Sequence, residues 1–262
     1  MITLKIVSKE GLTKRVAQGK EVFLVYGELY EEGDHIVVAC EEENTFLVVQ
    51  LDDAIGESFI YLKNHTMDFA VPFEEKKRCY SPKSFSGKKH LLTARLATRE
   101  EVLAYKNLAL NKYDTHEGVG CFPHASANIE TRGESVFAAK NVINGNHANN
   151  DHGSWPYESW GINRDPHATM KIDFGRKVYI DKVVLYIRAD FPHDSYWTQA
   201  TLTFSDQSSM ICQLEKTPEA QVFSFGKKEV EWIQIEELIK ADDDSPFPAL
   251  SQFEVYGVEV GV

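Results

Sequence analysis

Short runs of β-branched and aromatic residues recur through the first hundred residues, and polar or glycine-containing breaks separate them. Such runs are typical of strands in an antiparallel sandwich or barrel, because bulky side chains pack well on a pleated surface. The expected strands are residues 22–26, 36–39, 46–51, 58–62 and 68–73. We therefore expect an all-β amino-terminal domain.

The later part of the chain repeats this pattern with longer loops. Ile172 and Phe174 alternate with Lys171 and Asp173, as a half-buried strand requires. Residues 170–187 are expected to form two strands around a turn. Further strands are expected at residues 107–111, 200–206, 230–235 and 250–257.

One short helix is predicted between the two strand-rich parts. Thr98 and Glu101 have the capping-box spacing, in which each side chain accepts a hydrogen bond from the backbone amide of the other residue. We place a domain boundary beside this helix. Residues 1–104 form a smaller amino-terminal β-domain in this interpretation, and residues 105–262 form a second domain.

The charge of the chain excludes one class of partner. The net charge over 262 residues is -12, which argues against nucleic acid because phosphate binding needs a basic face. No apolar run approaches the roughly 18 residues of a membrane helix, so no membrane contact is expected. The sequence begins directly on an alternating strand pattern without a signal-peptide core, which predicts a cytoplasmic location.

Two segments, residues 152–163 and 188–197, concentrate tryptophans among histidine, arginine, aspartate and asparagine. Flat rings beside hydrogen-bonding groups, in loops that flank strands, suit a sugar, which has both apolar faces and hydroxyls. Core packing is the alternative for each ring, because aromatic residues dominate protein interiors. The predicted ligand-binding residues are His124, His152, Trp155, Tyr157, Trp160, Arg188, Asp190, His193, Asp194 and Trp197.

Arg188 is the strongest polar candidate in this set. It follows the apolar residues 183–187, so its side chain is expected at the rim of a sheet. A guanidinium there can donate paired hydrogen bonds to adjacent sugar hydroxyls, and a salt bridge to Asp190 or Asp194 is compatible with that role. His124 joins the set because the sequence around it repeats around His193. If those loops meet, the histidines suit hydroxyl recognition or a transition metal.

Five motifs after residue 105 occur in a recognisable order. They are Asn-x-Ala at 107–109, A-x-N-V-I-N-G-N at 139–146, I-D-F-G at 172–175, S-D-x-S at 205–208 and F-E-V-Y-G at 253–257. This order resembles the discoidin or coagulation-factor C-type domain of the galactose-binding-like superfamily, which includes family-32 carbohydrate-binding modules. The resemblance implies a jelly-roll β-sandwich whose loops bind a glycan, and it does not cover residues 1–104.

The resemblance also implies a calcium site, and here the sequence departs from the family pattern. Asn144 stands where an acidic residue is common in the D-G-N loop, and Gln252 stands where a glutamate is common. Both changes remove a negative charge that a hard cation prefers. Calcium and a metal-free loop therefore remain alternatives, and no cofactor is required.

The sequence leaves three hypotheses for function. The first is non-catalytic binding of an oligosaccharide or glycan through the aromatic and polar loops. The second is a protein-interaction or oligomerisation module, with a homodimer as one form. The third is a glycan hydrolase that uses the histidines and aspartates of the loops as acid and base. No nucleophile elbow or catalytic triad spacing supports the third, so a non-enzymatic role is expected.

Overall fold

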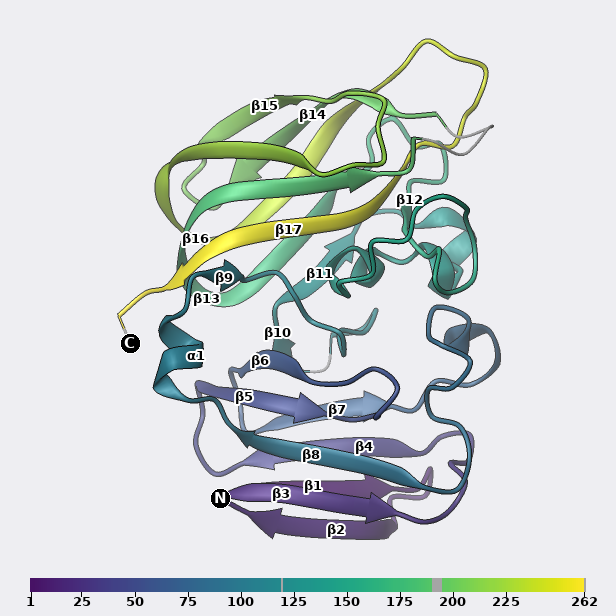
Figure 1. Ribbon diagram of the computed structural model, residues 1–262, viewed down its shortest axis with the longest axis vertical. Helices are drawn as coiled ribbons and strands as arrows, with labels where there is room; N and C mark the ends of the chain where they lie inside the picture. The colour runs from purple at the N-terminus through teal and green to yellow at the C-terminus, as the bar shows by residue number, and fades with distance from the viewer. Residues whose placement is uncertain (119, 190–194, 262) are drawn as a thin grey trace.

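The computed structural model describes residues 1–118, 120–189 and 195–261. The chain is nearly all β, which confirms the predicted fold class. Figure 1 shows two strand-rich parts stacked along the long axis of the molecule. Within the described ranges, no helix combines the length and the apolar character that crossing a bilayer requires.

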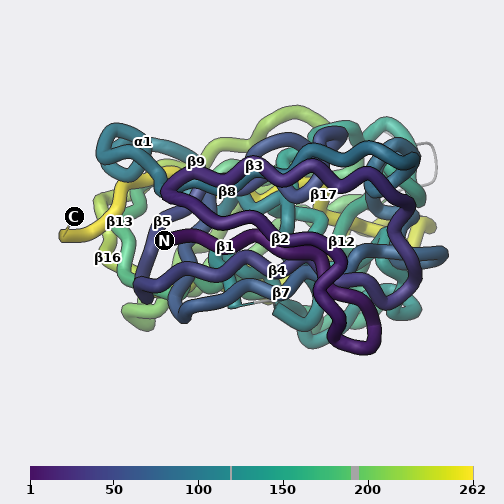
Figure 2. The backbone as a smooth tube through the Cα atoms, turned by 90° about the horizontal axis from the view of Figure 1, so that it is seen from below, coloured from purple at the N-terminus to yellow at the C-terminus, as the bar shows by residue number. Residues whose placement is uncertain are grey.

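The amino-terminal part is a sandwich of two antiparallel sheets, with strand orders β2-β1-β4-β7 and β10-β6-β5-β8-β3. Viewed from below, β3 and β8 run side by side, as do β1 and β2 (Figure 2). The bounds are β1 (Ile2–Val7), β2 (Thr13–Gly19), β3 (Glu21–Tyr26), β4 (His35–Cys40), β5 (Thr45–Gln50), β6 (Ser58–Leu62), β7 (Thr66–Ala70), β8 (His90–Leu96) and β10 (Cys121–Phe122).

Alternating side chains fill the space between these two sheets. Ile2, Leu4 and Ile6 of β1 point inward and are fully buried, while the residues between them are partly exposed. Tyr113 and Cys121, which come after the predicted boundary at residue 105, also pack in this core. The chain therefore returns to the amino-terminal sandwich before it builds the second part.

The second part is one strongly curved antiparallel sheet with the order β12-β17-β13-β16-β14-β15. Two short strands extend it, since β11 pairs with β13 and β9 pairs with β17. The sheet surrounds a separate hydrophobic core. The bounds are β9 (Lys106–Asn107), β11 (His124–Ala127), β12 (Trp160–Gly161), β13 (Met170–Ile187), β14 (Trp197–Phe204), β15 (Ser209–Gln213), β16 (Gln221–Lys240) and β17 (Ala249–Glu259).

The prediction that residues 170–187 form two strands around a turn is wrong. This segment is the single strand β13, which pairs with β16 on both sides of a register shift between Asp173 and Val178. Gly175 has a φ of +69°, and its amide donates to Asp173 Oδ1 at 2.7 Å. The irregularity bends the strand instead of reversing it, because the partner strand continues in the same direction.

The predicted helix is present as α1 (Arg99–Leu103) with its capping box, in which the amide of Glu101 donates to the hydroxyl of Thr98. Beside α1, Tyr105 donates from its hydroxyl to Asp181 Oδ1 at 2.7 Å, which ties the helix to β13. The remaining helical segments are single 3-10 turns, with bounds η1 (Glu74–Lys77), η2 (Thr131–Gly133), η3 (Ser135–Phe137) and η4 (Ala139–Ile143).

Candidate functional site

The predicted ligand-binding residues do not form one cluster. Trp160 and Trp197 lie inside the second core, with 0% and 1% of their surface exposed. A sugar cannot stack on a ring that is already covered on both faces, so the prediction that these two rings contact a ligand is wrong. They pack against each other with ring centroids 6.4 Å apart, because β12 and β14 present them to the same core.

His152 and Arg188 line one cavity of about 190 Å³, called the rim cavity here, together with Asn163, Arg164 and Phe247. It lies where β13 ends and β17 begins. Asp190, His193 and Asp194, which the sequence also assigns to the ligand site, lie outside the described residues.

Arg188 is fixed in the wall of the rim cavity. Its backbone amide donates to the carbonyl of Ala249 at 3.1 Å, which joins the end of β13 to the start of β17. Its guanidinium donates from Nη1 to Ser159 Oγ at 3.3 Å, and only 4% of the residue is exposed. A guanidinium held in this way is preorganised to bind oxygen atoms, because little side-chain entropy remains to be lost.

Phe247 supplies an aromatic ring that the sequence interpretation missed. It is 43% exposed, and the guanidinium of Arg164 lies 4.6 Å from its ring centroid. The local signal was an aromatic residue between Pro246 and Pro248 in a loop. Two prolines restrict the backbone around the ring, which favours a fixed exposed position.

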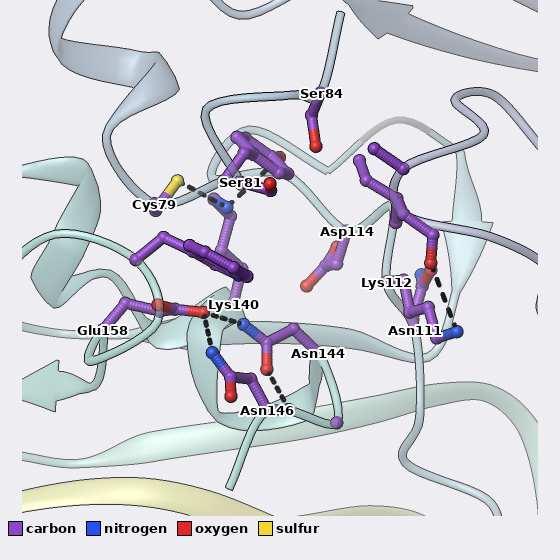
Figure 3. A pocket seen from close by; sticks show the side chains of 15 residues that line it. Cys79, Ser81, Ser84, Asn111, Lys112, Asp114, Lys140, Asn144, Asn146 and Glu158 are labelled. Atoms are coloured by element: carbon purple, nitrogen blue, oxygen red, sulfur yellow. Dashed lines mark hydrogen bonds between the residues drawn. The ribbon is translucent and has the colours of Figure 1, made fainter. Parts of the chain in front are cut away.

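Trp155 lies in a second cavity, of about 240 Å³, called the central cavity here. Its walls come from residues 54–55 and 79–84 of the amino-terminal part, from residues 111–114, and from residues 140–158 of the second part (Figure 3). The Trp155 ring is 42% exposed, unlike the two core tryptophans. Tyr157 is partly buried and lines neither of these two cavities.

His124 is paired with a carboxylate instead of joining His152. It starts β11, and its Nδ1 lies 2.7 Å from Asp114 Oδ1. Burial lowers the pKa of His124, but the hydrogen bond and charge of Asp114 raise it by more, so the net shift is upward. Among the described residues, no three histidine, cysteine or acidic side chains are grouped as a metal ion would need.

The calcium loop does not fit a cation. Gln252 Nε2 lies 2.8 Å from the carbonyl of Asn141, 2.9 Å from Asn144 Oδ1 and 2.6 Å from the carbonyl of Ser251. Its Oε1 accepts from the amide of Gly145 at 3.0 Å. The oxygens that calcium would need converge on the amide NH2 group, whose hydrogens carry partial positive charge and donate to them. The neutral side chain of Gln252 therefore holds this loop in place through its hydrogen bonds.

We expect the substitution Gln252→Glu to make stability depend on calcium. The new carboxylate would face the same oxygens but has no N–H to donate to them. We expect this to lower the free energy of unfolding by about 2 kcal/mol when a chelator removes calcium. Added calcium should restore this loss by supplying positive charge. Thermal unfolding in EDTA and in calcium measures both effects. A wild-type protein that is itself stabilised by calcium would contradict this interpretation.

No family model and no curated protein matches the sequence. Comparison with solved structures finds similar folds. The family 32 carbohydrate-binding module of C. perfringens NanJ, in complex with galactose, is 14% identical with a TM-score of 0.42, and the match covers 58% of this chain and 99% of that one.

The lectin domain of lectinolysin, complexed with Lewis B antigen, is 18% identical with a TM-score of 0.44, and the match covers 58% of this chain and 96% of that one. Chitosan-binding module 1 from a chitosanase/glucanase of Paenibacillus sp. IK-5 is 19% identical with a TM-score of 0.39, over 58% of this chain and 98% of that one. A likeness at this level concerns the arrangement of strands alone.

Proposed function

We propose that this protein binds carbohydrate without cleaving it, and that the rim cavity is the binding site. The observation that carries the proposal is the exposed Phe247 ring in the same cavity as the fixed guanidinium of Arg188 and the imidazole of His152. A sugar ring has C–H faces that pack on an aromatic ring and hydroxyls that bind guanidinium and imidazole nitrogens.

The size of the rim cavity supports a ligand of one sugar ring. Its volume of about 190 Å³ is below the roughly 300 Å³ at which drug-sized pockets begin. A single terminal residue of a glycan fits such a volume, while the rest of the chain extends into solvent. In this proposal residues 105–262 form the binding domain, apart from the stretch with Tyr113 and β10 that packs in the amino-terminal core, and residues 1–104 act as a scaffold or docking unit.

We expect Phe247→Ala to weaken binding about tenfold, since a ring contact contributes about 1–1.5 kcal/mol beyond its buried area. Arg188→Gln should weaken it by at least tenfold, because sugar oxygens lose a charged donor. A glycan array identifies the ligand, and isothermal titration then gives the affinity of each variant. Phe247 is exposed, so its replacement leaves the fold intact and keeps the test decisive.

Arg15→Gln is the matched control, because Arg15 is an exposed arginine on β2 in the other part of the molecule. It should bind with wild-type affinity. Wild-type affinity in both Phe247→Ala and Arg188→Gln would remove the rim cavity from consideration. The hydrolase hypothesis depends on Asp190, His193 and Asp194, which lie outside the described residues, and stays a hypothesis.

A further inference from the structure

The central cavity contains a buried carboxylate that is only half satisfied. Glu158 is 3% exposed, and its Oε1 accepts from Asn144 Nδ2 at 2.8 Å and from Asn146 Nδ2 at 3.0 Å. In the described part of the chain, no donor reaches its Oε2. Burial raises the pKa of this carboxyl group. An unmatched buried acceptor is costly, so Oε2 is available for a donor that enters the cavity.

A second unmatched polar atom lines the same cavity from the other half of the molecule. Ser84 is fully buried, and its Oγ has no hydrogen-bond partner among the described residues. Figure 3 shows Ser84 at the upper edge of the cavity and Glu158 with its two asparagines at the lower edge. A ligand between them can bond to both halves at once.

Lys140 adds a positively charged donor. Its Nζ donates to Cys79 Sγ and to the hydroxyl of Tyr80, both at 3.3 Å, and lies 4.5 Å from the centroid of the Tyr80 ring. No carboxylate of the described residues is within ion-pair distance of it. An ammonium group can donate three hydrogen bonds, so one remains for an oxygen atom in the cavity.

Trp155 gives the cavity its flat apolar wall. Its backbone amide donates to the carbonyl of Arg78 at 2.8 Å, and Arg78 Nε donates to Ser154 Oγ at 3.3 Å. These two bonds hold the loop around Trp155 against the amino-terminal part. The indole ring therefore lines the junction between the two halves.

We propose that the central cavity is a second binding site, separate from the rim cavity, for a neutral polyhydroxylated ring the size of a monosaccharide. A hydroxyl both donates and accepts, so one ring can satisfy Glu158 Oε2, Ser84 Oγ and Lys140 Nζ while its C–H face packs on Trp155. The carboxylates of Glu158 and Asp114 disfavour an anionic ligand, and the ammonium groups of Lys140 and Lys112 disfavour a cationic one. The cavity volume of about 240 Å³ is small for a drug-sized ligand and suits one such ring.

The test is a titration of the whole protein, monitored by its tryptophan fluorescence. The compounds added are glucose, galactose, mannose, N-acetylglucosamine and myo-inositol. Trp155 is far more exposed than the buried Trp160 and Trp197, so a ligand on its ring should change the emission. We expect one of these compounds to change it in the wild type and in Arg188→Gln. Ser84→Ala should weaken that binding threefold to tenfold, and Trp155→Phe should abolish the fluorescence change.

Ser84→Ala keeps the experiment decisive, because removing an unpartnered hydroxyl does not destabilise the fold. If no compound changes the emission, or if Ser84→Ala and Glu158→Gln both bind with wild-type affinity, the proposal is wrong. A response that Arg188→Gln abolishes and Ser84→Ala leaves unchanged assigns the ligand to the rim cavity alone. That result would overturn the second site while supporting the proposed function.

Discussion

Trp160→Ala should lower the free energy of unfolding by about 3–5 kcal/mol, the range for removing a buried aromatic side chain. The ring lies fully inside the second core, and its Nε1 donates to the carbonyl of Ile129 at 3.0 Å. The substitution loses the packed area, leaves a cavity between β12 and η4, and removes the hydrogen-bond partner of the partly buried Ile129 carbonyl. Denaturant unfolding monitored by circular dichroism measures the loss.

Trp155→Ala is the matched control, because that residue is 42% exposed and its loss should cost clearly less stability than the loss of Trp160. A third tryptophan, Trp197, separates the contribution of packing from that of hydrogen bonding. Trp197 Nε1 has no partner among the described residues, so Trp197→Phe should cost less than Trp160→Phe. Equal stability of Trp160→Ala and Trp155→Ala would show that Trp160 does not support the core.

The second large effect on the free energy of unfolding is expected at the ion pair between Arg176 of β13 and Glu259 of β17. Arg176 Nε donates to Glu259 Oε2 at 2.7 Å, and both side chains are almost fully buried. The guanidinium also lies 5.0 Å from the ring centroid of Phe46 and 4.7 Å from that of Tyr61. The pair therefore joins the second part to β5 and β6 of the amino-terminal sandwich.

Glu259→Ala should lower the free energy of unfolding by about 3–5 kcal/mol, because it leaves a buried guanidinium without its counter-charge. The neighbouring pair Lys177–Glu229, 2.9 Å apart and exposed, offers a control. Glu229→Ala should cost less than about 1 kcal/mol, because water screens that pair. Denaturant unfolding compares the two variants, and an equal cost would contradict the role assigned to burial.

The pattern of residue types over a few neighbouring positions was sufficient to predict much of the secondary structure. The expected strands at residues 22–26 and 58–62 are β3 and β6 almost to the residue, since alternation and β-branched side chains are properties of neighbours in sequence. The capping box at Thr98 was found for the same reason, because both of its hydrogen bonds close within four residues. The bend in β13 was misread as a turn, since pairing with β16 decides between them.

Which of the predicted site tryptophans is exposed could be decided only from the whole structure. Trp155 and Trp160 lie close together in sequence, yet one is exposed in the central cavity and the other is buried in a core. Nothing in their immediate neighbours separates them. What separates them is β12, which places Trp160 against β17 and inside the second core.

The sequence by itself determined the all-β class, the capping box and the acidic balance, because each depends on residue types and short spacings. The tertiary structure alone decided which side chains meet. It set Gln252 among the oxygens of the 141–145 loop, Phe247 in the same cavity as Arg188, and Ser84 in the same cavity as Glu158. These groups of residues are distant in the chain, and only the packing of the sheets and loops brings them together.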